Sequence, residues 1–218
     1  LERLYPDRVE EIASTLALHF VKAEQHEKAI RYFMVAGDRA RASFANNEAI
    51  QFYQSALTQI EKTDKQSDLR FQLHEALGEL LNLIGQRETA RQYFTRALAM
   101  TEDPIPQARL YRKTVLSFVD ERTFTQAEEN FANGEELLKR TSSTGPTWWH
   151  EVVQNQLDRF WMYYFQSQTD KVEKIVQELQ PWVEANGSLL QKARFYMGLG
   201  QIALRKQRFV VTAKDVAI

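Results

Sequence analysis

One spacing of small and aromatic residues recurs along the chain and limits the folds that it can adopt. A small residue is followed by a large ring one helical turn later and by a second small residue at the next turn. Positions three and four apart share one face of a helix, so each copy predicts a helix with a tightly packed face. The copies are Ala29-x3-Phe33-x2-Ala36, Ala49-x3-Tyr53-x2-Ala56, Ala90-x3-Phe94-x2-Ala97, Ala127-x3-Phe131-x2-Gly134 and the degenerate Val172-x3-Val176-x2-Leu179.

A second position precedes the first residue of each copy by twelve residues, and it is glycine in two of them. These positions are Ala17, Gly37, Gly78, Val115 and Phe160. Two helices approach closely only where neither carries bulk at the contact. We therefore expect antiparallel hairpins, in one of which Leu77 and Gly78 meet Ala90 and Phe94.

Helical spacing of apolar residues continues over nearly the whole chain, and no alternating strand pattern interrupts it. Pro181 falls inside one helical stretch and is expected to kink or end that helix near Gln180. The longest polar break, 141–147, is the expected joint between hairpins over 1–140 and more degenerate hairpins over 148–218 in one continuous array. The predicted helices are 7–23, 26–43, 46–62, 66–85, 87–101, 105–121, 124–140, 147–167, 169–186 and 189–206.

The clearest copy resembles the tetratricopeptide repeat (TPR). It reads His74-x2-Leu77-Gly78-x2-Leu81, then Ala90-x3-Phe94, then Pro104, where the repeat has W-x2-L-G-x2-Y, A-x3-F and P. The resemblance implies an all-α right-handed superhelix, or solenoid, of antiparallel helical hairpins. The copies depart from the regular period of about 34 residues. The short step from Ala29 to Ala49 requires the helix 28–42 to belong to two successive pairs.

The N-terminal third is also similar to the segment that follows the nucleotide-binding core in STAND-type signalling ATPases, some of which carry an adenylate cyclase domain. This resemblance implies a non-catalytic arm of a larger signalling protein. No GxxxxGK[ST] phosphate loop occurs in the chain, so catalysis is expected outside it. The residues that carry the resemblance are Leu18, His19, Phe20, Ala29, Tyr32, Ala36, Gly37, Ala40, Asn47, Glu48, Ala49, Tyr53 and Ala56.

Composition argues against several kinds of site. A net charge of -1 gives no overall basic excess for nucleic acid, and no apolar run reaches the roughly 18 residues that span a membrane. The chain lacks Cys, and none of its four His residues has the spacing of a metal site. We therefore expect no enzyme, cofactor or metal. Because the chain starts at Leu1 without a signal peptide, we expect part of a longer cytoplasmic protein, truncated at its C-terminal end.

Two functional hypotheses follow. The first is an interaction module whose concave face, built from the first helix of each pair, binds a peptide or a partner domain. The second is a small-molecule sensor that controls an attached ATPase, cyclase or transcription-activator domain. A closed apolar pocket of roughly several hundred Å³ would favour the sensor, and an open groove would favour the module.

The stretch 148–165, "WWHEVVQNQLDRFWMYYF", is either packed on all sides by neighbouring helices or partly exposed in the groove. We expect an apolar or aromatic partner segment, anchored by Trp161 and Tyr164 with Arg112 at the rim. Full burial of both rings would make this docking site wrong. TPR-like geometry predicts a groove lined by Arg112, Leu116, Leu157, Trp161, Tyr164, Phe165 and Met197.

Further partners are expected at the ends of the array. These are neighbouring domains of the same chain and a second copy that pairs through the C-terminal end, but no nucleic acid and no membrane. The tail 208–218 is expected to begin the second helix of a pair whose first helix is 189–206, with Thr212 twelve residues after Gly200. Too short to cover its partner, this tail would fray or be covered by another chain.

Overall fold

The computed structural model describes residues 9–63, 67–142 and 144–206, and these residues form α-helices and no strand. The all-α prediction is confirmed, and the helix ends agree with the predicted ones to within a few residues for nine of the ten helices. The helices are α1 (Ala13–Lys22), α2 (His26–Ala42), α3 (Asn46–Ile60), α4 (Ser67–Leu83), α5 (Arg87–Leu98), α6 (Pro104–Asp120), α7 (Phe124–Arg140), α8 (Pro146–Phe165), α9 (Thr169–Asn186) and α10 (Leu189–Lys206).

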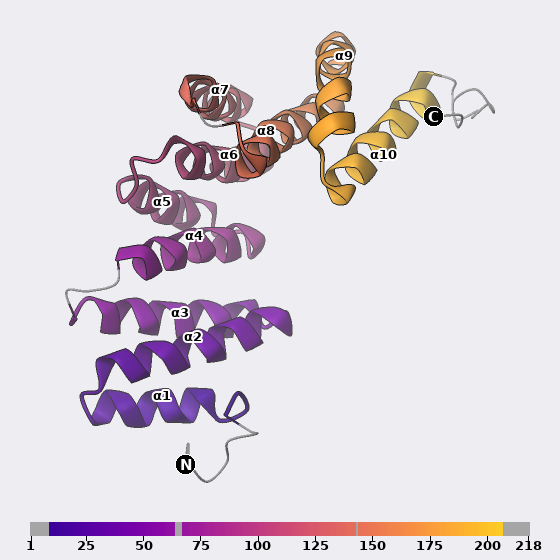
Figure 1. Ribbon diagram of the computed structural model, residues 1–218. Coiled ribbons are helices and arrows are strands. Elements are labelled where there is room, and N and C mark those ends of the chain that lie inside the picture. The colour runs from indigo at the N-terminus through magenta and orange to yellow at the C-terminus, as the bar shows by residue number, and fades with distance from the viewer. Residues whose placement is uncertain (1–8, 64–66, 143, 207–218) are drawn as a thin grey trace. The chain divides into compact units, whose positions relative to one another are not determined.

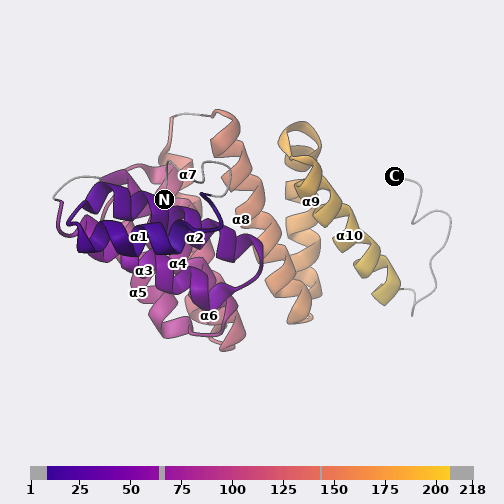
Figure 2. The ribbon, with the colours of Figure 1, turned by 90° about the horizontal axis from the view of Figure 1, so that it is seen from below.

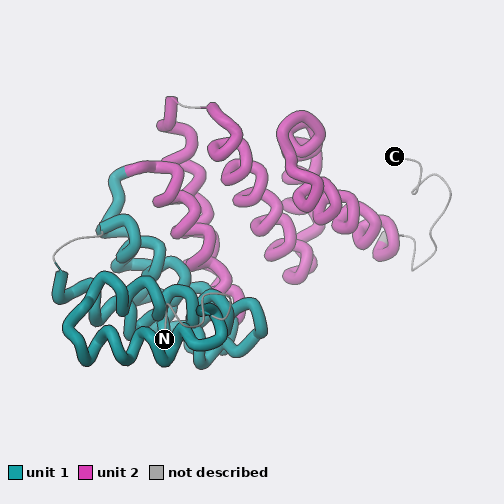
Figure 3. Tube along the Cα trace, turned by 60° about the horizontal axis from the view of Figure 1, so that its bottom comes forward, with its two compact units in different colours: residues 1–102 teal, residues 103–218 magenta. Residues whose placement is uncertain are grey.

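The chain divides into two compact units, Leu1–Glu102 and Asp103–Ile218 (Figure 3). In unit 1 each helix packs on the next one along the chain, so α1 to α5 form a stack (Figure 1). α2 packs on both α1 and α3. This is the double role that the short step between Ala29 and Ala49 predicted.

In unit 2 the central helix is α8, which contacts α6, α7, α9 and α10. Figure 2 shows α8, α9 and α10 side by side. The helices α6, α8 and α10 form one row, since α8 packs against both of the others. A helix with four neighbours must be apolar on most of its surface, which explains the composition of 148–165.

Five turns between consecutive helices share one backbone geometry. Each has a residue in the left-handed conformation, with φ between 54° and 82°. Its amide donates to the carbonyl three residues back, and the next amide donates to the carbonyl five residues back, which is the Schellman motif. The left-handed residues are Glu24, Phe44, Gly85, Arg122 and Ser167.

Each left-handed residue lies five positions before the first residue of a copy of the repeat, at Ala29, Ala49, Ala90, Ala127 or Val172. Because the turn geometry is the same each time, the first residue of each copy packs at an equivalent place against the helix before the turn. The internal repeat of the sequence is also a repeat of structure.

The glycine contacts confirm the predicted hairpin packing. A Cβ atom added to Gly78 would lie 2.5 Å from Cε1 of Phe94, and one added to Gly37 would lie 2.3 Å from Cε1 of Tyr53. Real Cβ atoms do not approach a ring carbon this closely, so any side chain at either position would force the helices apart. Ala90 is fully buried beside this contact.

Replacing Ala90 with Leu is expected to lower the free energy of unfolding by about 1–3 kcal/mol, because the added carbons overpack the interface between α4 and α5. Urea denaturation monitored by far-UV circular dichroism measures this change. The equivalent substitution at Ala99, which follows α5, is the control and should change the free energy little. Equal midpoints for Ala90→Leu and the parent protein would contradict the pairing of these two helices.

α9 continues through Pro181 to Asn186, in agreement with the predicted helix 169–186, so the helix does not end near Gln180. Pro181 is exposed, so water can solvate the carbonyl that loses its amide partner.

The compact units divide between Glu102 and Asp103 rather than at 141–147. Contacts such as the hydrogen bond from Asn155 Nδ2 to the Phe131 carbonyl, 3.2 Å, hold the helices on both sides of that loop in one unit. The tail 208–218 lies outside the described residues.

His74 occupies the position at which the repeat usually has an aromatic residue. Its ring is buried and lies 5.5 Å from the Tyr93 ring, and its Nδ1 has no hydrogen-bond partner within the part of the chain that the structure describes. Burial, together with the positive charges of Arg96 and Arg70, lowers the pKa of His74 to about 4, against the opposing charge of Glu61. The neutral imidazole is therefore the form that fits the fold.

His74 is expected to make the protein less stable in mild acid. Between pH 6.5 and 4 the unfolded chain binds a proton that the folded chain does not, so stability falls as the pH is lowered through this range. The melting temperature should therefore drop more steeply from pH 7 to pH 5 in the parent protein than in His74→Phe, which keeps the aromatic packing. Parallel pH profiles for the two proteins would show that His74 does not titrate in this way.

Candidate functional site

The predicted groove residues lie on the three helices of one row in unit 2. Arg112 and Leu116 lie on α6, Met197 lies on α10, and the other four lie on α8. Because α8 packs against both α6 and α10, the structure brings the predicted set onto adjacent helices. The individual side chains, however, have very different environments.

The C-terminal end of α8 carries a continuous cluster of four rings. Trp161 lies 5.3 Å from Phe160, 5.5 Å from Tyr164 and 5.8 Å from Phe165, measured between ring centres. Phe160 is fully buried, Tyr164 is nearly buried, Trp161 is partly buried, and Phe165 is 71% exposed. The cluster therefore runs from the core of unit 2 to its surface, and the indole nitrogen of Trp161 has no hydrogen-bond partner among the described residues.

Leu157 and Arg112 have surroundings that differ from the expected groove lining. Leu157 is completely buried in the core around α8, because the four neighbours of this helix cover that position. Arg112 lies inside an ion-pair network rather than at a rim. Its Nε donates to Glu151 Oε2 at 3.1 Å and one terminal nitrogen donates to Asp158 Oδ2 at 3.0 Å.

The network around Arg112 joins α6, α8 and α10. Arg194 donates to the second carboxylate oxygen of Asp158 at 3.0 Å, and the Gln154 amide donates to that oxygen at 2.9 Å. Burial opposes the charge of Arg112, but the nearby carboxylates of Glu151 and Asp158 outweigh it and raise the pKa of the guanidinium. Arg112 is therefore a structural cation that holds the row together.

Three predicted residues remain well exposed: Leu116 at 54%, Phe165 at 71% and Met197 at 55%. Of the two predicted anchors, Tyr164 is nearly buried and Trp161 is partly exposed, so the two rings are not both fully buried. The exposed residues and Trp161 are the part of the predicted groove that a partner could contact. We call Leu116, Trp161, Phe165 and Met197 the apolar face.

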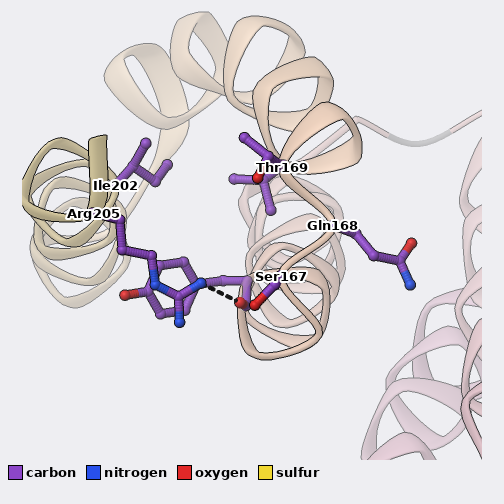
Figure 4. Close-up of a pocket in the computed structure, with 7 residues that line it drawn as sticks. Ser167, Gln168, Thr169, Ile202 and Arg205 are labelled. Carbon is purple, nitrogen blue, oxygen red and sulfur yellow. Dashed lines mark hydrogen bonds between the residues drawn. The ribbon is translucent and has the colours of Figure 1, made fainter. Parts of the chain in front are cut away.

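A cavity of about 170 Å³ adjoins the aromatic cluster at the turn between α8 and α9 (Figure 4). The guanidinium carbon of Arg205 lies 3.8 Å from the ring centre of Tyr164, and one of its nitrogens donates to the Tyr164 carbonyl at 2.9 Å. The Tyr164 hydroxyl donates to Gln201 Oε1 at 3.4 Å. The cavity is lined by Tyr164, Ser167, Gln168, Thr169, Val172, Ile202 and Arg205.

Sequence reasoning did not single out this cavity. Its wall includes Ser167, which adopts the left-handed conformation. Glycine is the residue type that usually marks this conformation, so the sequence gives no sign of the turn that shapes the wall. With about 170 Å³, the cavity is smaller than the roughly 300–1,000 Å³ of typical small-molecule pockets.

Two larger hollows, of about 430 and 320 Å³, are lined by residues of α7, α8 and α9 and share Tyr163 and Lys171. Charged side chains contribute to both walls, and they make up most of the lining of the smaller hollow. Arg159 forms ion pairs with Glu128 and Glu135, and the Tyr163 hydroxyl donates to Glu128 at 2.6 Å. Neither hollow is the closed apolar pocket that would favour the sensor hypothesis. Within the described ranges, no three His, Asp or Glu side chains are placed to hold a metal ion, and no helix is long and apolar enough to cross a membrane.

Comparison with known proteins identifies a similar fold. The crystal structure of BtubC (BKLC) from P. vanneervenii matches with a TM-score of 0.65, covering 93% of this chain and 82% of BtubC. Neither a protein-family description nor a curated protein matches the sequence. The chain has an all-helical, repeat-like fold. With 18% sequence identity, the likeness to BtubC concerns the fold alone.

Proposed function

We propose that the chain is a non-catalytic, TPR-like interaction module that binds a peptide or a partner domain through the apolar face. The observation that carries this proposal is the exposure of large apolar side chains on all three helices of one row, Leu116 on α6, Phe165 on α8 and Met197 on α10. Exposed apolar and aromatic side chains that extend from a packed core are typical of binding sites.

The repeated Schellman turns and the glycine contacts support the TPR-like part of the proposal. In a superhelix of such hairpins, the first helices line the concave face, and α6, α8 and α10 would be those helices in unit 2. The aromatic cluster supports an apolar or aromatic segment as the ligand, because Phe165 and Trp161 offer it ring surface.

The resemblance of the N-terminal third to STAND-type ATPases supports a wider setting. In this proposal the chain is a cytoplasmic arm that senses a partner or scaffolds the neighbouring domains of a larger signalling protein. A small-molecule sensor is the alternative hypothesis, and the modest volume of the cavity beside Tyr164 gives it less support.

Selection of a displayed peptide library on the purified protein tests the proposed function. Peptides that bind should be rich in apolar and aromatic residues, and fluorescence anisotropy should show at least a roughly tenfold weaker affinity for Phe165→Ala and Leu116→Ala. Leu18→Ala is the matched control, because Leu18 is similarly exposed, at 58%, but lies on α1 in unit 1. Binding that is equally strong in all three variants would place the site elsewhere.

A further inference from the structure

The dipeptide Asn-Gly occurs twice in the chain, where Asn133 precedes Gly134 and where Asn186 precedes Gly187. An asparagine followed by glycine is the sequence at which a protein most readily loses side-chain ammonia, because glycine has no side chain to shield its amide nitrogen. Both asparagines are exposed. Residue type and exposure therefore do not distinguish the two sites, and only their backbone environments differ.

The loss of ammonia is a reaction of the protein with itself. The backbone nitrogen of the glycine attacks Cγ of the asparagine and closes a succinimide ring, while the bond between Cγ and Nδ2 breaks. The proton of the glycine amide leaves with Nδ2 as ammonia. Water then opens the ring at either of its carbonyls, which yields aspartate or isoaspartate. The reaction consumes only water, but the glycine nitrogen must be free to approach Cγ.

Asn133 is protected by its place in the fold. Asn133 and Gly134 lie in the interior of α7, where each amide donates to the carbonyl four residues back. Gly134 is also buried, and a Cβ atom added to it would lie 3.2 Å from the Ala108 carbonyl oxygen on α6. The Gly134 nitrogen therefore reaches Cγ of Asn133 only if the middle of α7 unfolds and separates from α6.

Asn186 is the last residue of α9, at the turn that leads into α10 (Figure 1). The Gly187 amide donates to the Val183 carbonyl at 2.9 Å, and the next amide, that of Ser188, donates forward to Gln191 Oε1 at 3.0 Å. In the five Schellman turns the equivalent next amide donates back to its own helix. A single hydrogen bond therefore holds the Gly187 nitrogen, and the last turn of a helix opens at little cost in free energy.

Gly187 is required by the same turn that makes Asn186 reactive. A Cβ atom added to Gly187 would lie 2.6 Å from the Val183 carbonyl oxygen and 3.2 Å from Val183 Cα. A larger residue would shield the amide nitrogen, but it does not fit without a shift of the backbone. The packing of the turn therefore retains the reactive dipeptide.

The reaction at Asn186 takes place beside the contacts that attach α10 to α8. Ser188 Oγ accepts from the Gln191 amide at 3.3 Å, which completes a capping box at the start of α10. Gln191 Nε2 donates to the His150 carbonyl of α8 at 2.9 Å. Isoaspartate lengthens the backbone by one carbon two positions before Ser188, so the capping box no longer lies in register with His150. Aspartate adds a charge but keeps the length of the backbone.

We infer that Asn186 is a site of self-modification. It converts to aspartate and isoaspartate in the folded protein, whereas Asn133 does not, and the isoaspartate form loosens the start of α10. The site acts as a slow chemical switch at the junction of α8, α9 and α10, and it involves none of the residues of the apolar face.

The test follows both asparagines in the intact 218-residue chain during incubation in mildly alkaline buffer. Peptide mass spectrometry of timed samples should show that Asn186 converts at least about tenfold faster than Asn133, because helix ends open far more readily than helix interiors. In urea the two asparagines should convert at comparable rates, since the unfolded chain presents the same dipeptide at both places. The comparison of the folded and unfolded chains therefore measures the protection that the fold gives.

Matched variants identify the site and the cause of the loosening. Asn186→Gln should abolish labelling of the aged protein by isoaspartyl methyltransferase, because its longer side chain closes a ring much more slowly, and it should keep the circular dichroism spectrum of the parent. Asn133→Gln should leave the labelling unchanged. Asn186→Asp carries the charge without the longer backbone. Hydrogen exchange at the Gln191 amide should be at least about tenfold faster in the isoaspartate form than in Asn186→Asp.

Several results would overturn the inference. These are equal conversion of the two asparagines in the folded protein, the absence of isoaspartate at Asn186, or labelling that Asn186→Gln leaves unchanged. Rates that already differ to the same extent in urea would assign the selectivity to neighbouring residues rather than to the fold. Equal hydrogen exchange at Gln191 in the isoaspartate form and in Asn186→Asp would show that α10 is not loosened.

Discussion

Replacing Glu151 with Ala is expected to lower the free energy of unfolding by about 3 kcal/mol, among the largest effects of any single substitution in unit 2. Glu151 is nearly completely buried, and its carboxylate lies 3.1 Å from the guanidinium of Arg112. Removing one partner of a buried ion pair typically costs about 3–5 kcal/mol, because the remaining charge stays desolvated. The loss expected for Glu151→Ala lies at the low end of this range, because Asp158 still contacts Arg112 at 3.0 Å.

A matched double variant distinguishes the loss of an ion pair from a loss of packing. Arg112→Met combined with Glu151→Leu removes both charges and keeps similar volume, so its stability should be close to that of the parent protein. Urea denaturation at pH 7 measures the three proteins. An exposed ion pair contributes less than about 1 kcal/mol to the free energy of unfolding. A loss of that size for Glu151→Ala would show that the network is solvated and does not hold α6 to α8.

The hairpins could be predicted from the sequence because their packing contacts are close in sequence and specific in size. Gly78 and Phe94 lie on consecutive helices joined by one short turn, and only a residue without a Cβ atom fits against that ring. The turns themselves gave a weaker signal. Only Gly85 is a glycine, and Phe44 and Arg122 adopt the same left-handed conformation without the residue type that favours it.

The candidate site was harder to predict because burial on α8 depends on helices that are distant in sequence. The spacing placed Leu157 and Trp161 on the same side, but in the helix packing around α8 Leu157 is buried and Trp161 is partly exposed. Arg112 is enclosed by carboxylates that lie 39 and 46 positions further along the chain. Charged residues on a helix are normally solvated, so no local pattern indicates this enclosure.

The two glycines near the end of α10 have different surroundings. The twelve-residue spacing selects Gly200, whose expected partner Thr212 lies outside the described residues, and the structure places Gly198 against a ring. A Cβ atom on Gly198 would lie 2.5 Å from Cε1 of Phe160. Gly198 therefore contributes to the packing of α10 on α8, which lies two helices back along the chain. This assignment gives the two glycines opposite expected responses to the same substitution.

Gly198→Leu is expected to lower the free energy of unfolding by about 3 kcal/mol, the upper end of the usual overpacking cost. Phe160 is fully buried and packed by Trp161 and Tyr164, so it has no space into which it can move. Gly200→Leu should instead raise the stability by about 0.5–1 kcal/mol, because Leu is a better helix former than Gly and its side chain meets open space. Both glycines lie in the same helix, so the difference in helix propensity cancels between the two variants and leaves the contact with Phe160. Thermal and urea unfolding of the pair measure the difference, and equal stabilities would mean that α10 does not pack on α8 through Gly198.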